Sequence, residues 1–308
     1  MENSIERKSL IKGYICIILA AFMYSTQEIA GKKLALFKLD PYQVIFWAFF
    51  VAIILMIAPA CREMKKRKIK FKANDFGYFT VVGILCVPLS MTALQMSLSY
   101  INAATVAVII STTAIFAIPL SFFILNEKIT KKIAIGLIVS IVGLLILINP
   151  ESLIDSRSAR SHLIGIGLAF FAAIVFSLYT VISKKRVQQY GGMVLNFFSF
   201  VIGDIVLFVG LLISGRPIID NITNIEMVIL LVIMGLLVKF LGYIFYQQAI
   251  ESTSATIAST TFMIKPIIGP ILAIIFLGEA LHLNFWVGVI VIIIGSYIIF
   301  KCKLSREK

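Results

Sequence analysis

Long apolar segments separated by short polar ones make up most of this chain of 308 residues. A helix needs about 20 predominantly apolar residues to cross the hydrocarbon core of a bilayer. The segments are too long for strands, and only helices satisfy the whole backbone within one segment. The pattern predicts ten membrane-spanning helices, at about residues 13–34, 42–60, 76–98, 103–125, 133–149, 163–183, 194–213, 226–249, 255–277 and 284–300.

The composition favours a membrane protein over a soluble one. Hydrophobic residues make up 60% of the chain and charged residues only 14%, against roughly 25% charged in ordinary soluble domains. A soluble fold of this size does not have enough interior to hide so much apolar side chain. We therefore expect an all-α integral membrane protein whose surroundings are the lipid bilayer.

The distribution of positive charge predicts the orientation of the helices. The net charge is +13, and with a cytoplasmic N-terminus twenty Lys and Arg residues fall in inside segments against six in outside segments. This bias is the positive-inside pattern of multispanning proteins in the cytoplasmic membrane. With ten spans, both termini are cytoplasmic. We interpret the basic segment 62–72 as a topology-setting loop at a lipid surface, so no nucleic-acid partner is expected.

The chain also matches itself at an offset of 152 residues. This divides it into two halves, 1–150 and 151–308, with five predicted spans each. Because five is odd, the second half enters the membrane the opposite way up. Inverted repeats are typical of secondary transporters, whose substrate site lies at the repeat interface near the bilayer midplane. The matches include Gly83 with Gly235, Gln95 with Gln247, Glu127 with Glu279, and Lys32-Lys33 with Lys184-Lys185.

Motifs that would indicate catalysis or a bound cofactor do not occur in the sequence. There is no P-loop, no GxGxxG at a strand–helix junction, no HExxH and no GxSxG. The four cysteines include no CxxC pair, and the two histidines lie at predicted helix ends, so neither a disulfide framework nor a metal site is implied. We expect no cofactor, no metal and no enzymatic activity.

The segment PIIGPILAIIFLGE, residues 266–279, is followed by Gly288 and Gly295. It resembles the proline-to-LGE signature of the drug/metabolite transporter superfamily, specifically of proteins with two EamA-type domains. The resemblance extends over nearly the whole chain and implies a cavity lined mainly by helices 1, 3, 4, 6, 8 and 9. It also implies that the last helix of each half is peripheral, that helix 7 is peripheral, and that solute is exported.

The first half departs from this signature. Asn126-Glu127 with Gly136 and Gly143 is a looser copy, and Ala114 stands where the signature proline is expected. The first helix lacks the usual Trp-Gly of the family. Because of these departures, the part of the site that the first half contributes is expected to differ from that of the family.

Charged residues inside the predicted spans are the first candidates for function, because charges at this depth are rare. Lys265 directly precedes Pro266, and proline removes a backbone donor, so with Pro270 it marks a hinge where polar backbone can face a cavity. Lys265 is a candidate ligand for a substrate carboxylate or phosphate. Glu28 and Asp204 are candidates for proton coupling, Asp204 with the alternative of a polar contact between helices.

These charges also have a structural interpretation. Two acids and two bases can neutralise one another in pairs. Glu28 in particular has Lys32 at i+4, the favourable order for an ion pair along one helix.

Lys239, Tyr243 and Tyr246 recur at i, i+4 and i+7, which places them on one face of a helix. Such a face suits an anionic, partly aromatic solute, or it forms a buried polar seam. Gly235 and Gly242 form a stripe of small residues of the kind that packs against a neighbouring helix.

Three further polar residues complete the predicted site. Tyr24 lies within two turns of Glu28. Gln95 and Gln247 are repeat mates that either contact substrate or form hydrogen bonds between helices.

The sequence therefore predicts a secondary transporter that moves a small polar metabolite by alternating access, with an amino acid or another carboxylate-bearing solute as the first expectation. Without a nucleotide-binding motif, energy must come from a gradient of protons or of a counter-solute. A flippase for a lipid-linked polar headgroup and an integral-membrane enzyme are the alternatives. Monomer and homodimer both stay open, because the glycines of 136–143 and 288–295 can pack within one chain or between two.

Overall fold

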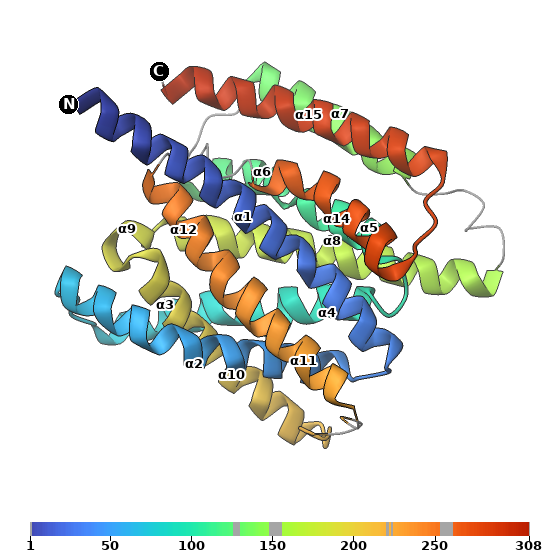
Figure 1. Ribbon diagram of the computed structural model, residues 1–308, viewed down its shortest axis with the longest axis horizontal. Coiled ribbons are helices and arrows are strands. Elements are labelled where there is room, and N and C mark those ends of the chain that lie inside the picture. Colours follow the sequence, from blue (N-terminus) through green and yellow to red (C-terminus); the bar gives the residue numbers. More distant parts are fainter. Residues whose placement is uncertain are drawn as a thin grey trace.

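The computed structural model describes residues 2–125, 130–147, 156–219, 222, 224–252 and 261–307, and within these ranges the chain is helical with short turns (Figure 1). Asn126-Glu127, the end of the predicted span 133–149 and the start of the predicted span 255–277 lie outside the described residues. Within these described ranges, seven helices are long and apolar enough to cross a membrane, and two shorter apolar helices cover Ile264–Leu277 and Leu283–Ile299. The protein is a multi-pass membrane protein.

The helices of the first half follow the predicted segments, and two of the predicted spans are interrupted. One is divided by a stretch of π-helix, η1, and another by a turn at Thr112. The elements are α1 (Glu2–Leu36), α2 (Pro41–Arg67), α3 (Ala73–Ile84), η1 (Leu85–Met91), α4 (Thr92–Ser97), α5 (Ala103–Ser111), α6 (Thr113–Leu125) and α7 (Lys131–Leu147).

The second half has the same order of helices, with a second π-helix, η3, inside its third span. A short extra helix, α9, precedes α10. The elements are α8 (Ser156–Lys184), α9 (Val187–Tyr190), α10 (Gly192–Ile213), α11 (Ile225–Ile233), η3 (Met234–Gly242), α12 (Tyr243–Ser252), α14 (Thr261–Leu277) and α15 (Leu283–Glu307).

The turn between α1 and α2 is built from residues with a strong local preference. Lys38 adopts a positive φ of 59° after the end of α1. The Asp40 carboxylate accepts a hydrogen bond from the backbone N–H of Tyr42 at 2.8 Å, and Pro41 occupies the first position of α2, both typical of helix starts. Arg216 lies 2.6 Å from Asp40, so the turn is also tied to the end of α10.

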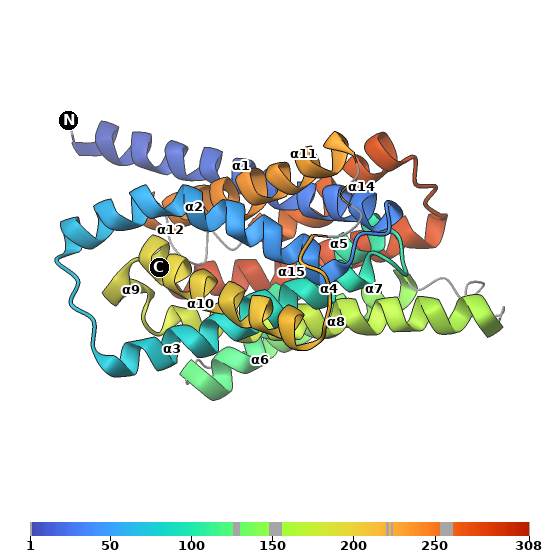
Figure 2. The same ribbon diagram turned by 90° about the horizontal axis from the view of Figure 1, so that it is seen from below.

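The two halves pack crosswise. In the first half α1 packs against α14, α12 and η3 of the second half, and α8 packs against the corresponding α6, α4 and η1. Figure 2 shows α1 and α11 on one side of the bundle and α3, α6 and α8 on the other. Each half therefore inserts its first helix into the other half.

Close contacts at glycines also occur at equivalent positions in the two halves. A Cβ added at Gly83 in α3 would lie 2.9 Å from the backbone nitrogen of Gly203 in α10, and one added at Gly235 in η3 would lie 2.6 Å from Cβ of Val51 in α2. Val51 and Gly203 are themselves separated by 152 residues. The packing is thus repeated at the same offset as the sequence.

The π-helices correct the prediction that 76–98 and 226–249 are continuous α-helices. η1 and η3 lie at nearly the same offset, so both halves widen the helix at the equivalent place. The pattern of apolar residues does not reveal the π-helical stretches. A π-turn contains one extra residue and so rotates the side chains that follow it, but the segment stays equally hydrophobic. π-Helical turns are frequent at functional sites.

α7 and α15 run side by side along one edge of the molecule (Figure 1). A Cβ added at Gly136 would lie 2.8 Å from the carbonyl oxygen of Gly295, and one added at Gly143 would lie 2.9 Å from that of Gly288. The glycine stripes therefore pack against each other within one chain, as expected for close helix contacts in membranes.

We predict that Gly143→Leu destabilises the protein by about 1–3 kcal/mol, because the side chain would be forced into the backbone of α15. The measurement is unfolding in mixed micelles. Gly167→Leu is the matched control: a Cβ at Gly167 meets nothing within 4 Å, and the change gains helix propensity. Equal stability of the two variants would contradict the contact.

Candidate functional site

A buried ion pair joins α1 to α14. Lys265 Nζ lies 2.7 Å from Glu28 Oε1, and the two side chains are 5% and 0% exposed. Isolated charges at this depth are expensive, so such groups pair. Lys265 precedes Pro266 inside α14, which continues through Pro266 and Pro270. The structure thus has one of the neutralising pairs that the sequence allows.

Glu28 does not pair with Lys32. The Lys32 ammonium instead donates hydrogen bonds to the backbone carbonyls of Leu98 and Ile101, at 2.8 and 2.9 Å. The expectation of an i,i+4 pair fails because lysine reaches backbone oxygens at the end of α4, whose carbonyls lack partners within the helix.

Lys239, in η3, is buried without a carboxylate partner among the described residues. Its Nζ lies 3.1 Å from Met91 Sδ and 4.9 Å from the centre of the Phe49 ring. It also interacts electrostatically with Glu28 and Lys265. We call Glu28, Lys239 and Lys265 the charged triad. With all three groups ionised, the triad carries a net charge of +1.

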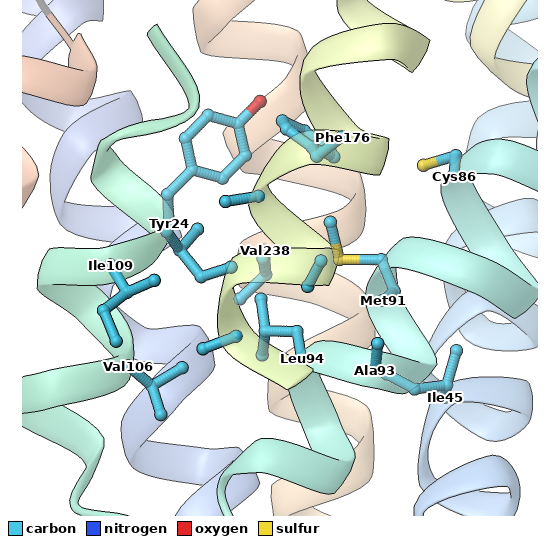
Figure 3. Packing of buried hydrophobic residues seen from close by; sticks show 14 of the residues in the cluster. Tyr24, Ile45, Cys86, Met91, Ala93, Leu94, Val106, Ile109, Phe176 and Val238 are labelled. Atoms are coloured by element: carbon cyan, nitrogen blue, oxygen red, sulfur yellow. The ribbon is translucent and has the colours of Figure 1, made fainter. Parts of the chain in front are cut away.

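Aromatic rings gather around Tyr24 beside the charged triad. The Tyr24 ring centre lies 5.5 Å from that of Tyr243, 6.2 Å from Tyr246 and 6.0 Å from Phe262. Figure 3 shows Tyr24 near Phe176, with Met91 and Cys86 farther along the same buried cluster. The rings come from α1, α12, α14 and α8. The predicted tyrosines are therefore brought together.

The two stripe glycines Gly235 and Gly242 face different helices. A Cβ at Gly242 would lie 2.9 Å from the Tyr24 ring, whereas Gly235 contacts α2. Both glycines thus lie where η3 packs closely against a neighbouring helix.

Several buried polar atoms near the triad have no hydrogen-bond partner among the described residues. They are both amide atoms of Gln27, the Oε2 of Glu28 and the hydroxyl of Thr261. Buried polar groups are almost always hydrogen-bonded in proteins, so unsatisfied ones next to charges indicate where a polar ligand or water binds. Both positions follow from helix spacing, since Gln27 precedes Glu28 on α1 and Thr261 lies four residues before Lys265 on α14.

Gln95 and Gln247 have different environments although they are repeat mates. The Gln95 amide donates to the Gly31 carbonyl at 2.8 Å and thereby joins α4 to α1. The Gln247 side chain contacts Gly192 at the start of α10. Of the two roles expected for Gln95, substrate contact and a hydrogen bond between helices, the structure has the hydrogen bond.

Asp204 lies on α10, one turn beyond Phe200, whose ring contacts those of Phe49 and Tyr243. It is buried in α10, which packs against α2, α3 and η1, and its Oδ1 has no partner among the described residues. It makes no ion pair with Lys239 or Lys265, both of which are described.

Two histidines that are distant in sequence share a cavity of about 220 Å³. His162 at the start of α8 and His282 before α15 line it together with Asn102, Thr105 and Asn284. None of the charged triad lines this cavity.

Comparison with known proteins identifies the family. The EamA-like transporter family matches residues 11–149 and 163–301. These two segments start 152 residues apart, the offset at which the sequence repeats. The chain belongs to the EamA-like transporter family and is a membrane transporter, not an enzyme.

Individual relatives agree with this assignment. An uncharacterized transporter of Clostridium kluyveri is 46% identical over 93% of this chain and 92% of its own length. The S-adenosylmethionine uptake transporter of Rickettsia prowazekii is 24% identical over 63% of this chain and 62% of its own length. A protein of known crystal structure has the same fold, with a TM-score of 0.64, 15% identity, and coverage of 96% and 97% of the two chains.

We predict that Glu28→Gln or Lys265→Met alone destabilises the protein by about 3–5 kcal/mol, because each leaves a buried charge unpaired. The double variant should lose less than the sum of the two. Unfolding in mixed micelles measures both. Thr180→Val is a control at the repeat position of Glu28: it removes a hydrogen bond to the backbone of its own helix and should cost about 1 kcal/mol. Additive losses in the double variant would contradict a coupled pair.

Proposed function

We propose that the protein is a secondary transporter of small zwitterionic metabolites, in the first place amino acids, which it moves across the cytoplasmic membrane by alternating access. The charged triad is the observation that carries this proposal. It offers two ammonium groups and one carboxylate in a buried place between the two halves. A solute with one carboxylate and one ammonium group matches this arrangement.

The fit follows from charge and from the unsatisfied atoms. A substrate carboxylate would neutralise the ammonium of Lys239, whose neighbours are a thioether and an aromatic ring. A substrate ammonium would bind Glu28 Oε2, which has no partner among the described residues. Charge-assisted hydrogen bonds of this kind are stronger than neutral ones. The rings around Tyr24 supply apolar contact for the remainder of the solute.

The predicted topology supports alternating access. We propose ten spans arranged as two inverted five-helix halves, 1–150 and 151–308, with cytoplasmic termini. The crosswise packing and the repeated glycine contacts support this arrangement. Rocking of one such half against the other around a fixed midplane site is a common mechanism in inverted-repeat transporters.

One relative agrees with the proposed substrate class. The Rickettsia prowazekii protein is named as an uptake transporter of S-adenosylmethionine, which carries an amino-acid group. A carrier of this type works in either direction, and the gradients decide the net flux. We propose export as the physiological direction.

The proposal is tested by a thermal-shift screen of the purified protein against amino acids, nucleosides, sugars and organic anions, followed by flux measurements on the hits in proteoliposomes. Stabilisation by zwitterionic amino acids and saturable flux are expected. Stabilisation only by uncharged sugars, or by none of the amino acids, would reject the substrate class.

We predict that Lys239→Met lowers amino-acid flux by about tenfold or more, the effect of losing roughly 1.4 kcal/mol of binding. The same change should leave stability unchanged or raise it, since it removes a buried charge that has no ion pair among the described residues. Flux in proteoliposomes and unfolding in micelles measure the two effects. Lys33→Met is the control, because Lys33 is a half-exposed lysine on the same helix as Glu28. Full flux in Lys239→Met would contradict the assignment.

We further propose that a proton and the substrate ammonium compete for Glu28, which would couple export to proton entry. In Glu28→Gln an imposed pH gradient should no longer drive flux, because the amide does not titrate. The readout is flux with and without the gradient, with substrate exchange at equal pH as the control for a folded protein. A gradient response equal to that of the parent would exclude Glu28 as the coupling group.

A further inference from the structure

Lys32 binds the backbone at one end of the bundle. Its ammonium donates to the carbonyls of Leu98, 2.8 Å away, and Ile101, 2.9 Å away. Leu98 follows the last residue of α4, and Ile101 lies in the turn that leads to α5. A cation is favourable at a helix C-terminus, where carbonyls lack partners within the helix. Lys32 thereby fixes α1 to the turn between α4 and α5.

Glu279 binds the other side of the same turn. It follows α14, and its two carboxylate oxygens accept hydrogen bonds from the backbone N–H groups of Ala103 and Ala104, at 2.7 and 3.0 Å. These N–H groups open α5. Asn102 stands at the N-cap, where asparagine usually caps with its own side chain, and makes no such bond. The cap of α5 is therefore supplied by a distant element.

The two residues act on one short segment. Residues 98–104 are bound by Lys32 from α1 and by Glu279 from the end of α14, and the two charges also interact with each other. We call this set of contacts the outer latch. α1 and α14 are the helices that carry the ion pair of Glu28 and Lys265. Lys32 lies one turn, about 6 Å along the axis, beyond Glu28.

We propose that the outer latch holds the outer end of the transporter closed and that its release opens the route to the charged triad. The inference rests on the proposed alternating access. The four hydrogen bonds all end on backbone atoms of one segment, so a shift of that segment breaks them together. Contacts of this kind give two discrete arrangements rather than a continuous one. Lys32 and Glu279 are thus positioning residues for the transport cycle and need not contact the solute.

A native thiol can report opening at the centre. Cys86 is fully buried in η1, with its sulfur 3.9 Å from the Tyr243 hydroxyl, and it interacts electrostatically with Lys239. The experiment uses the full chain with Cys16, Cys61 and Cys302 replaced by serine. A membrane-impermeant thiosulfonate is added to right-side-out and, separately, to inside-out membrane vesicles, and the rate of Cys86 labelling is measured.

Lys32→Gln and Glu279→Gln should each raise the labelling rate from the outer face by about tenfold, the shift produced by losing roughly 1.4 kcal/mol of charge-assisted bonding. Lys33→Gln is the matched control. Lys33 is the adjacent lysine on α1 and, in the part of the chain that the structure describes, its ammonium has a half-exposed contact of 3.9 Å with Glu226, so its replacement should leave the rate unchanged.

An unchanged labelling rate in a folded latch variant, or an increase from the inner face alone, would overturn the proposal. Size-exclusion chromatography establishes folding, and each variant is judged separately, so one that fails to fold leaves the other to decide. If both fail to fold, the contacts serve the fold and the proposal is overturned. The labelling requires no substrate. Faster labelling without amino-acid flux would therefore reject the proposed substrate and leave the latch intact.

Discussion

The ion pair between Glu28 and Lys265 is the interaction around which the rest of the molecule is arranged. An unpaired carboxylate or ammonium buried at this depth carries a large desolvation cost. The pairing of Glu28 with Lys265 therefore holds α1 next to α14. These helices belong to different halves of the chain. Their contact brings Tyr24 and Phe262 together and places Lys239 within electrostatic range of the pair. The polar centre and the assembly of the halves thus depend on the same bond.

Packing is repeated between the halves, but charge is not. The repeat positions of Glu28 and Lys265 are Thr180 and Thr113, and both hydroxyls bond to backbone carbonyls of their own segment, at 2.8 and 2.6 Å. The repeat position of Lys239 is a valine. Glycine contacts therefore recur in the two halves, whereas Glu28, Lys239 and Lys265 have no charged counterparts at their repeat positions. Close helix contacts depend on the size of the residues between the helices, and the repeat preserves this size. Binding of a polar solute would need only one set of charged residues.

Several buried or half-buried polar side chains form hydrogen bonds with backbone atoms of other helices. Lys32, Gln95 and Glu279 all bind main-chain groups of helices distant in sequence. The contacts of Lys32 and Glu279 satisfy backbone groups at helix ends, which have no partners within the helix. They leave no charge pattern in the sequence, because the partner residues Leu98, Ala103 and Gly31 contribute only carbonyl or N–H groups. This is why Lys32 was expected to pair with Glu28 and does not.

The sequence by itself determined that the protein is a helical membrane protein of the EamA type. Apolar length fixes a membrane helix because the bilayer leaves no other way to satisfy the backbone. It also identified Glu28, Lys239 and Lys265, since charges at that depth are rare. Only the tertiary structure decided which of them pair, and among the described residues it gives Asp204 no ion pair. Pairing depends on which helices touch, and π-turns such as η3 rotate side chains without any mark in the hydrophobic pattern.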